Sequence, residues 1–311
     1  MSQAPDSELV GPGADDFAAN RPRLVRLAYR MLGSLAEADD VAQDAWLRWQ
    51  GVDRRAIADP AAWLVRTATR LCLDRLRADK TRREAYRGPW LPEPLIEDLA
   101  EDPLERAEEV SVAFLLALER LSPLERAVFL LHDVFDTDFA AVAETLGRSE
   151  AACRQLAVRA RDHVRDTRPR FAVGQAEAAR LALAFMDAAR SNDLDQLRSL
   201  LAEDAVLITD GGGKRSAALR PLIGRDDILT LFKGLQWRSS WLVKPSKVRL
   251  VRVNGYLGAI LDTEDGPITV AFQPGGGGRL AAIYMVVNPE KLTRVEPGEV
   301  QGSSPSDAVS P

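Results

Sequence analysis

Histidine and cysteine are scarce in this sequence, with two of each among 311 residues. The two cysteines, Cys72 and Cys153, both fall on apolar stripes of predicted helices, so the sequence predicts neither a disulfide framework nor a metal site. No apolar run is long enough to span a membrane, and the first residues lack the features of a signal peptide. We therefore expect a protein of the reducing cytoplasm that uses no cofactor and has no membrane partner.

Acidic and basic residues are unevenly distributed along the chain. The net charge of −5 is the sum over blocks of opposite sign. Residues 54–87 contain ten Arg and Lys against four Asp and Glu, whereas residues 88–109 contain eight acidic residues against Arg106 alone. This pattern indicates a surface that faces a polyanion, followed by an acidic connector. With 46% hydrophobic residues, the chain is long enough to form two or three cores.

The segment 138–165 has the pattern of a helix-turn-helix. Apolar residues recur at i, i+3, i+4 and i+7 from Phe139, Gly147 is expected to end this first helix, and Ser149 is expected to cap the next one. The second helix has one apolar stripe, and the rest of its surface carries Arg and Gln. These side chains can bind guanine and adenine in the major groove. A solvated basic helix in a bundle is the alternative for this segment taken alone.

Two earlier helices carry polar faces. Ser34 begins a capping box for a helix with a mostly polar outer face. Asp59 and Pro60 predict the start of the third helix. The outward strip of this third helix consists of Arg66, Thr69, Arg70, Arg77 and Lys80. A basic strip suits phosphate contacts, since each neutralised phosphate releases counterions. A soluble basic helix is the alternative interpretation.

Together these motifs resemble the extracytoplasmic-function sigma factors of RNA polymerase. The string Ala38–Arg48 resembles the helix with which that family binds the polymerase clamp. Residues 62–77 resemble the helix that melts and reads the −10 element. The helix-turn-helix takes the place of the module that reads the −35 element, so the resemblance covers about residues 15–170.

The resemblance implies core RNA polymerase and promoter DNA as partners. It assigns polymerase binding to Asp39, Asp40, Gln43 and Asp44. It assigns the −10 contacts to the basic strip of the third helix. The −35 contacts, carried over from the family's recognition helix position by position, are assigned to Arg154, Gln155, Val158 and Arg159. Leu156 departs from the common family pattern, where a polar residue is more usual, and falls on the buried stripe.

The connector that follows contains the string Arg87–Pro94, in which three prolines within six residues favour an extended backbone. Trp90 is expected to anchor this segment to a neighbouring surface. The string is similar to a signature of the SigJ-like group of sigma factors, which carry a large carboxy-terminal extension. Structural packing alone is the alternative explanation.

After Gly174 the pattern changes to two amphipathic helices, a short strand, a further helix and four β-rich runs. Asn-Gly and glycine-rich separators between the β runs predict hairpins, and helices followed by a curled antiparallel sheet form an α+β arrangement. The order resembles SnoaL-like domains, cone-shaped half-barrels that often hold a small molecule. The resemblance therefore adds a small-molecule ligand to the expected partners.

The predicted fold is multidomain, with two all-α helical sigma domains, the second a helix-turn-helix, followed by an α+β SnoaL-like half-barrel. The expected boundaries are 1–14 for a disordered start, 15–86 for the domain that binds polymerase and the −10 element, 87–109 for an acidic proline-containing linker, 110–170 for the helix-turn-helix domain, 175–292 for the SnoaL-like domain and 293–311 for a disordered tail.

These features predict a sigma factor that directs promoter recognition and is regulated in cis by its extension. The residues expected to join the extension to the sigma portion are Trp90, Pro92, Asp210, Lys214, Asn288 and Pro289. The alternative is a SnoaL-like enzyme of the cyclase or isomerase type, fused to a DNA-binding regulator. Because residues 171–311 contain no histidine, such chemistry would depend on carboxylates such as Asp210 or Asp262. An Asp beside three glycines is more often a turn former.

Overall fold

The structure is a computed structural model that describes residues 13–79, 83, 85–99, 110–165, 174–235 and 246–295. Most of the expected disordered start and tail, residues 1–12 and 296–311, lies outside these ranges. Within the described residues, Ala14 begins a helix and Val295 is buried.

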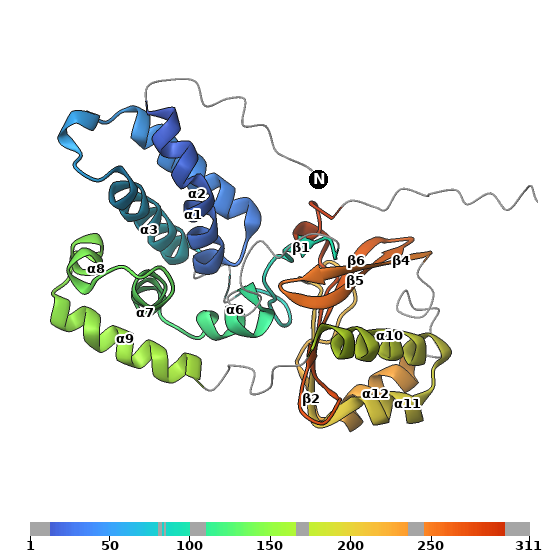
Figure 1. The fold of residues 1–311 in the computed structure, drawn as a ribbon. Coiled ribbons are helices and arrows are strands. Elements are labelled where there is room, and N and C mark those ends of the chain that lie inside the picture. Colours follow the sequence, from blue (N-terminus) through green and yellow to red (C-terminus); the bar gives the residue numbers. More distant parts are fainter. Residues whose placement is uncertain are drawn as a thin grey trace, which may run out of the picture.

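A helical region occupies residues 14–165 (Figure 1). Its helices are α1 (Ala14–Leu32), α2 (Leu35–Gln50), α3 (Pro60–Ala78), α6 (Val112–Glu119), α7 (Pro123–Phe129), α8 (Phe139–Leu146) and α9 (Glu150–Arg165). A short 3₁₀ turn (Arg54–Ala56) precedes α3, and a π-helical turn (Leu130–Val134) follows α7.

The helix ends agree with the capping residues predicted from the sequence. The Asp59 side chain accepts a hydrogen bond from the Ala62 N–H at 3.0 Å, and Ser149 accepts one from the Ala152 N–H at 3.2 Å. Gly147 ends α8 with φ 62°, a left-handed conformation that glycine adopts without steric cost. The helix-turn-helix pattern is therefore confirmed as local structure.

An α+β region follows. It consists of α10 (Gln175–Ser191), α11 (Leu194–Leu200), β2 (Leu201–Asp210), β3 (Leu222–Ile223), α12 (Arg225–Leu235), β4 (Lys247–Val253), β5 (Tyr256–Thr263), β6 (Gly266–Pro274), β7 (Leu280–Val286) and a 3₁₀ turn (Pro289–Lys291). Helices α10, α11 and α12 lie together on one side of the sheet (Figure 1). The predicted fold class, helical sigma-type domains followed by an α+β domain, is confirmed.

The sheet has the strand order β1-β4-β5-β6-β7-β2-β3. The expectation of an antiparallel sheet is wrong in one place, because β2 and β7 pair in parallel. These strands are far apart in sequence and run in the same direction, so no hairpin signal could reveal their pairing. The edge strand β1 (Ile96–Glu97) belongs to the connector and pairs with β4. The connector is therefore part of the sheet of the extension.

Three apolar clusters hold the chain together. One runs through α1–α3 and continues through α6–α9, so both helical modules share a core. A second lies between α10–α12 and one face of the sheet. The third, on the other sheet face, includes Tyr284 and Val286 of β7 together with Leu91 of the connector and Val112 of α6. Burial of this apolar surface stabilises the extension against the helical region.

Candidate nucleic-acid interface

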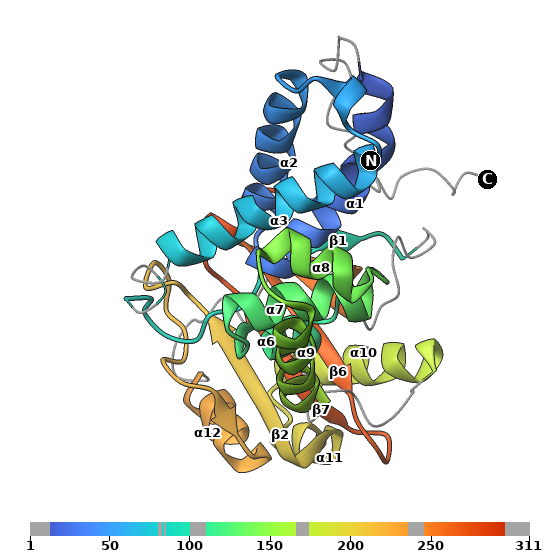
Figure 2. The ribbon, with the colours of Figure 1, turned by 90° about the vertical axis from the view of Figure 1, so that its left-hand side faces the viewer.

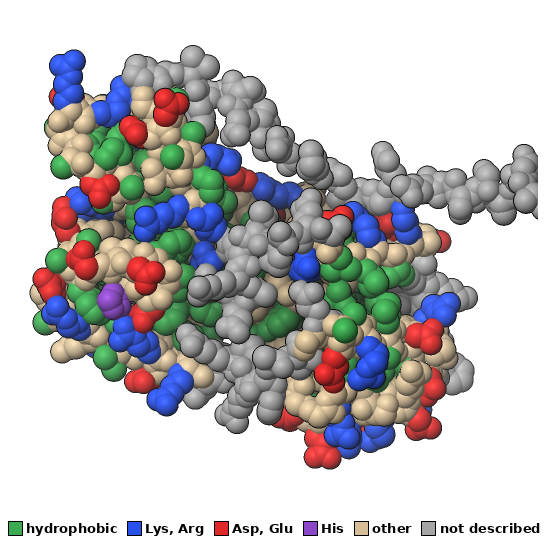
Figure 3. Space-filling view, viewed as in Figure 1, with side chains coloured by type: hydrophobic (Ala, Val, Ile, Leu, Met, Phe, Trp, Pro, Cys, Tyr) green, Lys and Arg blue, Asp and Glu red, His purple; other side chains and the backbone are tan. Residues whose placement is uncertain are grey.

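The outer face of α9 carries the four side chains predicted to read DNA. Arg154, Gln155, Val158 and Arg159 are all exposed and line a shallow hollow. Figure 3 shows Lys and Arg side chains along the edge of the helical region where α9 lies. Two local contacts orient Arg154. It forms an ion pair with Glu150 at 2.6 Å, and its guanidinium carbon lies 5.1 Å from the centre of the Phe139 ring in a cation–π contact.

The opposite stripe of α9 fixes this orientation. Cys153, Ala157, Ala160 and Val164 are buried in the shared helical core. Burial raises the pKa of the Cys153 thiol, which keeps it protonated and unreactive at neutral pH. The small side chains of this stripe let α9 lie close to α7, so its basic residues point away from the core.

On the predicted polymerase-binding face of α2, two carboxylates form ion pairs and the other two side chains are exposed. Asp39 forms ion pairs with Arg21 at 3.1 Å and with Arg294 at 2.9 Å, and Asp44 pairs with Arg75 at 2.7 Å. Asp40 and Gln43 are exposed. One turn further on, Leu47 is 57% exposed.

Two arginines of the predicted −10 strip of α3 contact α8. Arg66 forms an ion pair with Glu144 at 2.5 Å, and the Arg70 Nε donates to the Thr145 carbonyl at 3.2 Å. Helix α8 lies beside α3 in both ribbon views (Figures 1 and 2). Arg77 remains exposed and pairs with Asp74 on the same helix.

One residue of this strip is buried, and another lies outside the described residues. Thr69 was placed on the outward side of α3, but it is 0% exposed, and its hydroxyl donates to the Val65 carbonyl at 2.8 Å. The reason is tertiary, because the helix-turn-helix module packs against α3 at this position. Lys80 lies outside the described residues.

A buried arginine also joins the two helical modules. Arg126 of α7 donates to the Met31 carbonyl at 2.6 Å and pairs with Glu119 of α6 at 2.8 Å. Burial lowers the pKa of Arg126, and Glu119 opposes that effect. Since Glu119 belongs to the same module as Arg126, the arginine would keep its charge partner if the modules separated.

Asp210, at the end of β2, is fully buried where the connector meets the extension. Its Oδ1 accepts hydrogen bonds from the Tyr86 hydroxyl at 2.5 Å and the Gly212 N–H at 3.0 Å. Its Oδ2 accepts from the Leu91 N–H at 2.8 Å and lies 2.6 Å from the Lys291 Nζ. The carboxylate thus joins the connector to two separate segments of the extension.

Lys291 and Trp90 complete this cluster. The Lys291 Nζ lies 4.3 Å from the Trp90 ring centre and 5.0 Å from that of Tyr86, and it donates to the Leu91 carbonyl. Burial lowers the pKa of Lys291 to about 8, while the charge of Asp210 opposes that shift. Burial and the bond to Asp210 raise the pKa of Tyr86.

We call this cluster the Asp210 junction; its members are Tyr86, Trp90, Leu91, Asp210, Asn288 and Lys291. The Asn288 Nδ2 donates to the Tyr86 hydroxyl at 3.0 Å, and a Cβ at Gly212 would lie only 2.3 Å from that nitrogen. Of the other predicted joining residues, Pro92 is buried, whereas Lys214 and Pro289 are exposed at the rim. Lys214 pairs there with Glu290 at 3.0 Å.

Glu93 fastens the connector to the first helical module. Its Oε2 accepts hydrogen bonds from the N–H groups of Leu35 and Ala36, at 2.8 and 3.2 Å, and from the Ser34 hydroxyl at 3.0 Å. A carboxylate is favoured at a helix N-terminus by the helix dipole. The Tyr29 hydroxyl donates to the Glu93 carbonyl at 2.8 Å. The connector is therefore bound to α1 and α2 as well as to the extension.

The residues in these contacts that the sequence predictions do not name include Tyr86, Glu93, Lys291 and Arg294. Glu93 and Lys291 could have been found, since Glu93 lies inside the string Arg87–Pro94 and Lys291 lies two residues after the predicted Pro289. The others bind partners distant in sequence, and neither periodicity nor capping rules report such pairs. Asp210, considered above as a carboxylate for catalysis, has both oxygens occupied by these partners.

Within the described ranges, no helix is long and apolar enough to cross a membrane. In the same part of the chain, no group of three or more His, Cys, Asp or Glu side chains is arranged to hold a metal ion.

Two family models match the helical region. The model of Sigma-70 region 2 matches residues 17–82, and that of Sigma-70, region 4 matches residues 111–164. The first match spans α1–α3 and the second spans α6–α9.

Similarity to individual proteins extends over most of the chain. The ECF RNA polymerase sigma factor SigJ of Mycobacterium tuberculosis (strain ATCC 25618 / H37Rv) is 41% identical over 292 residues, which cover 89% of this chain and 92% of that protein. A probable ECF RNA polymerase sigma factor, SigI, of the same strain is 36% identical over 195 residues, which cover 61% of this chain and 67% of that protein. The crystal structure of the M. tuberculosis sigma factor SigJ superposes with a TM-score of 0.73 at 38% identity, covering 90% of this chain and 98% of that one.

Proposed function

The chain belongs to the extracytoplasmic-function sigma factors of RNA polymerase, and from this premise we propose how its residues perform and regulate transcription initiation. Sigma factors bind core RNA polymerase and promoter DNA, and the chain is accordingly a non-enzymatic initiation factor. Its place of action is then the cytoplasm, where polymerase and chromosome are.

Residues 15–86 form the domain for polymerase and the −10 element in this proposal, and residues 110–170 form the domain for the −35 element. Polymerase binding rests on Asp40 and Gln43, which are exposed, with Leu47 as an apolar anchor beside them. Asp39 and Asp44 belong to the same face but have internal ion-pair partners. Polymerase would compete with those partners for the two carboxylates.

Promoter contacts are assigned to two surfaces. On α9, Arg154, Gln155, Val158 and Arg159 read the −35 element, supported by their common exposure on one face. On α3, Arg66, Arg70 and Arg77 contact the −10 strand, with Lys80 after them. Because α8 occupies Arg66 and Arg70, promoter DNA must displace α8 from α3 before the −10 contacts can form.

Regulation in cis is the finer part of the proposal. The observation that carries it is the complete burial of Asp210 of the extension beneath the connector between the two DNA-reading modules. Glu93 binds the connector to the first helical module, and the Asp210 junction binds the connector to the extension. Together these contacts limit the positions that the second helical module can take. Arg294, which follows the junction, additionally pairs with Asp39 on the polymerase face. The α+β domain would also accept a small-molecule ligand, in a cavity under α10.

Charge reversal at Asp40 tests the polymerase assignment. Asp40→Lys should leave the fold unchanged, because the side chain is exposed, and should weaken binding of core polymerase about tenfold or more through like-charge repulsion. Asp44→Lys would be a poorer test, since it also breaks the bridge to Arg75. The matched control is Asp195→Lys, an equally simple reversal on α11 of the extension. Equal affinities of both variants and the unaltered chain for core polymerase would refute the assignment.

A further inference from the structure

The Phe139 ring, at the start of α8, contacts a second ring and a charged side chain. The His132 ring lies 3.9 Å from it, measured between ring centres, with the two planes tilted by 30°. The Arg154 guanidinium carbon lies 5.1 Å from the centre of the Phe139 ring. The His132 Nδ1 lies 2.8 Å from the Thr137 carbonyl oxygen, which holds the imidazole in place. We call Phe139, His132 and Arg154 the Phe139 stack; it joins α9 to the two elements that precede it.

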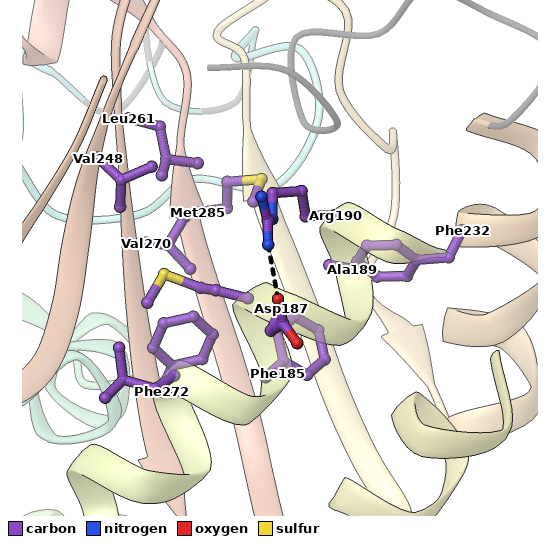
Figure 4. Close-up of a pocket in the computed structure, with 12 residues that line it drawn as sticks. Phe185, Asp187, Ala189, Arg190, Phe232, Val248, Leu261, Val270, Phe272 and Met285 are labelled. Atoms are coloured by element: carbon purple, nitrogen blue, oxygen red, sulfur yellow. Dashed lines mark hydrogen bonds and ion pairs between the residues drawn. The ribbon is translucent and has the colours of Figure 1, made fainter. Parts of the chain in front are cut away.

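Three phenylalanine rings of the α+β domain provide an example of core packing alone. The Phe185 ring lies 5.7 Å from Phe232 and 5.5 Å from Phe272, and all three side chains are buried (Figure 4). Phe139 is only partly buried, and Arg154 is exposed on the face of α9 that is proposed to read DNA. Core packing therefore accounts for the buried part of the Phe139 ring but not for its contact with a charged, exposed side chain.

The π-helical turn Leu130–Val134 places two consecutive side chains against the helix-turn-helix. His132 packs on Phe139 of α8. The neighbouring Asp133 accepts a hydrogen bond from the Arg161 Nε of α9 at 2.6 Å. Short π-helical segments are rare and occur frequently at functional sites. This one binds α9 twice, directly through Asp133 and indirectly through the Phe139 stack.

The two contacts of Arg154 restrict its side chain and leave donors for a base. Its Nη2 donates to the Glu150 Oε2 at 2.6 Å. A guanidinium has five N–H donors, of which this bond takes one, and a contact with an aromatic ring takes none. The remaining donors can form the paired hydrogen bonds to O6 and N7 of guanine. Arg154 can therefore keep both contacts while it reads a base.

Order in the free protein favours selective binding. Arginine has a long and flexible side chain, and fixing it on binding costs rotamer entropy. A guanidinium that is already held by a ring and a carboxylate loses less of this freedom when it meets a base. Paired hydrogen bonds also need a fixed plane and direction. The Phe139 ring, which packs against the helical core, provides a rigid support for both.

We propose that Phe139, supported by His132, is a positioning residue that sets how strictly Arg154 selects its −35 base. The phenyl ring touches no base in this proposal and acts only through the Arg154 guanidinium. The inference rests on the proposed function, in which Arg154 reads the −35 element, and adds the residue that orients it. Promoter specificity then depends on α8 and the π-helical turn as well as on the exposed face of α9.

Phe139→Leu tests the inference, because it removes the ring and keeps an apolar side chain against the helical core. We expect the preference for the best base pair at the position read by Arg154 to fall about two- to fivefold, the size of an exposed cation–π contact. Phe139→Tyr keeps the ring and should keep the preference. Binding of the holoenzyme, reconstituted with core polymerase, to promoters that vary one −35 base pair at a time measures it.

The matched control is Phe114→Leu. Phe114 of α6 is also partly buried, and its ring lies 6.2 Å from that of Phe129. This variant loses an aromatic contact in the same module without touching Arg154, and should keep the base preference. Because the preference is a ratio of affinities within one preparation, a partly unfolded fraction does not change it.

The double variant of Phe139→Leu with Arg154→Ala separates positioning from a general structural role. If Phe139 acts through Arg154, the double variant should have the base preference of Arg154→Ala alone. A further loss in the double variant, an unchanged preference in Phe139→Leu, or an equal loss in Phe139→Tyr would overturn the inference. Where Phe139→Leu does not fold, His132→Ala replaces it and should lower the same preference; an unchanged preference would then overturn the inference.

Failure of the proposed function gives a different result. If Arg154→Ala itself leaves the base preference unchanged, the proposed −35 role of Arg154 is wrong, and the inference falls with it. If Arg154→Ala relaxes the preference and Phe139→Leu does not, only the inference is wrong.

Discussion

The α8–α3 contact and the Asp210 junction, which add to the apolar core that both helical modules share, differ in burial. Where α8 covers α3, the Arg66–Glu144 ion pair lies at the surface, with the Glu144 side chain 62% exposed. In the Asp210 junction the carboxylate is 0% exposed and receives its hydrogen bonds from the connector and the extension. An exposed pair contributes little, because water screens it, whereas one side of a buried pair is costly to remove.

The difference suggests a division of tasks. The α8–α3 contact covers residues proposed to bind promoter DNA, and its polar part is weak enough for DNA phosphates to replace Glu144. The Asp210 junction covers no proposed DNA contact and joins the extension to the connector. We therefore expect the first contact to open during initiation and the second to remain closed.

The largest effect is expected from Asp210→Ala. This variant removes the acceptor of the Tyr86 and Leu91 hydrogen bonds and leaves Lys291 buried without its charge partner. We expect a loss of about 3–5 kcal/mol in the free energy of unfolding, together with altered promoter-dependent transcription. Urea unfolding and hydrogen exchange of the connector measure the loss.

The matched control for this variant is Asp204→Ala, at an exposed position on the same strand. It should leave both unfolding and connector exchange unchanged. If Asp210→Ala leaves the unfolding free energy and the connector exchange unchanged, as this control should, the Asp210 junction is not the more stable of the two contacts.

A smaller effect, on binding alone, is expected from Arg154→Ala. Arg154 lies outside both contacts, so its removal should not change the unfolding free energy appreciably. Loss of a bidentate contact to guanine should cost about 1–3 kcal/mol at the preferred −35 sequence and relax the preference at that base. Binding to a set of promoter variants measures it. A uniform loss on all sequences would identify Arg154 as a phosphate contact instead.

The smallest overall effect is expected from Glu144→Ala. Removal of this exposed carboxylate should cost at most about 1 kcal/mol of unfolding free energy, yet it uncovers Arg66 and should strengthen binding to single-stranded −10 DNA. Glu203→Ala, which removes a similarly exposed partner of Arg225 in the extension, is the control and should not affect DNA binding. Unchanged DNA binding by Glu144→Ala would mean that the ion pair does not restrict access to α3.

Local rules predict much of this architecture. Gly147, Ser149 and the stripe through Cys153 define the helix-turn-helix because turn geometry, capping and helical period depend on neighbouring residues. Thr69 was misplaced because a helical wheel gives the direction of a side chain but not the helix that covers it. The parallel pairing of β2 with β7 escaped prediction because the two strands are far apart in sequence and no local signal reports which strands pair.

The Asp210 junction was predictable only in part. The sequence analysis named Trp90, Asp210 and Asn288 among the residues expected to join the extension to the sigma portion, but it gave neither their partners nor their geometry. Tyr86 and Asp210 are 124 positions apart, and their 2.5 Å contact follows from the packing of the connector on the sheet. No pattern within one segment encodes such a contact.

Distances between spin labels on three exposed positions would show directly whether the α8–α3 contact opens while the Asp210 junction stays closed. Asp16→Cys on α1, Asp162→Cys on α9 and Asp195→Cys on α11 supply labelling sites. The native thiols should not compete, because both are buried and burial raises the pKa of Cys72 to about 12. On addition of core polymerase and promoter DNA, we predict that the α1–α9 distance lengthens while the α1–α11 distance stays the same. An unchanged α1–α9 distance in an active complex, or a lengthened α1–α11 distance, would contradict the claim that the first contact opens while the Asp210 junction holds.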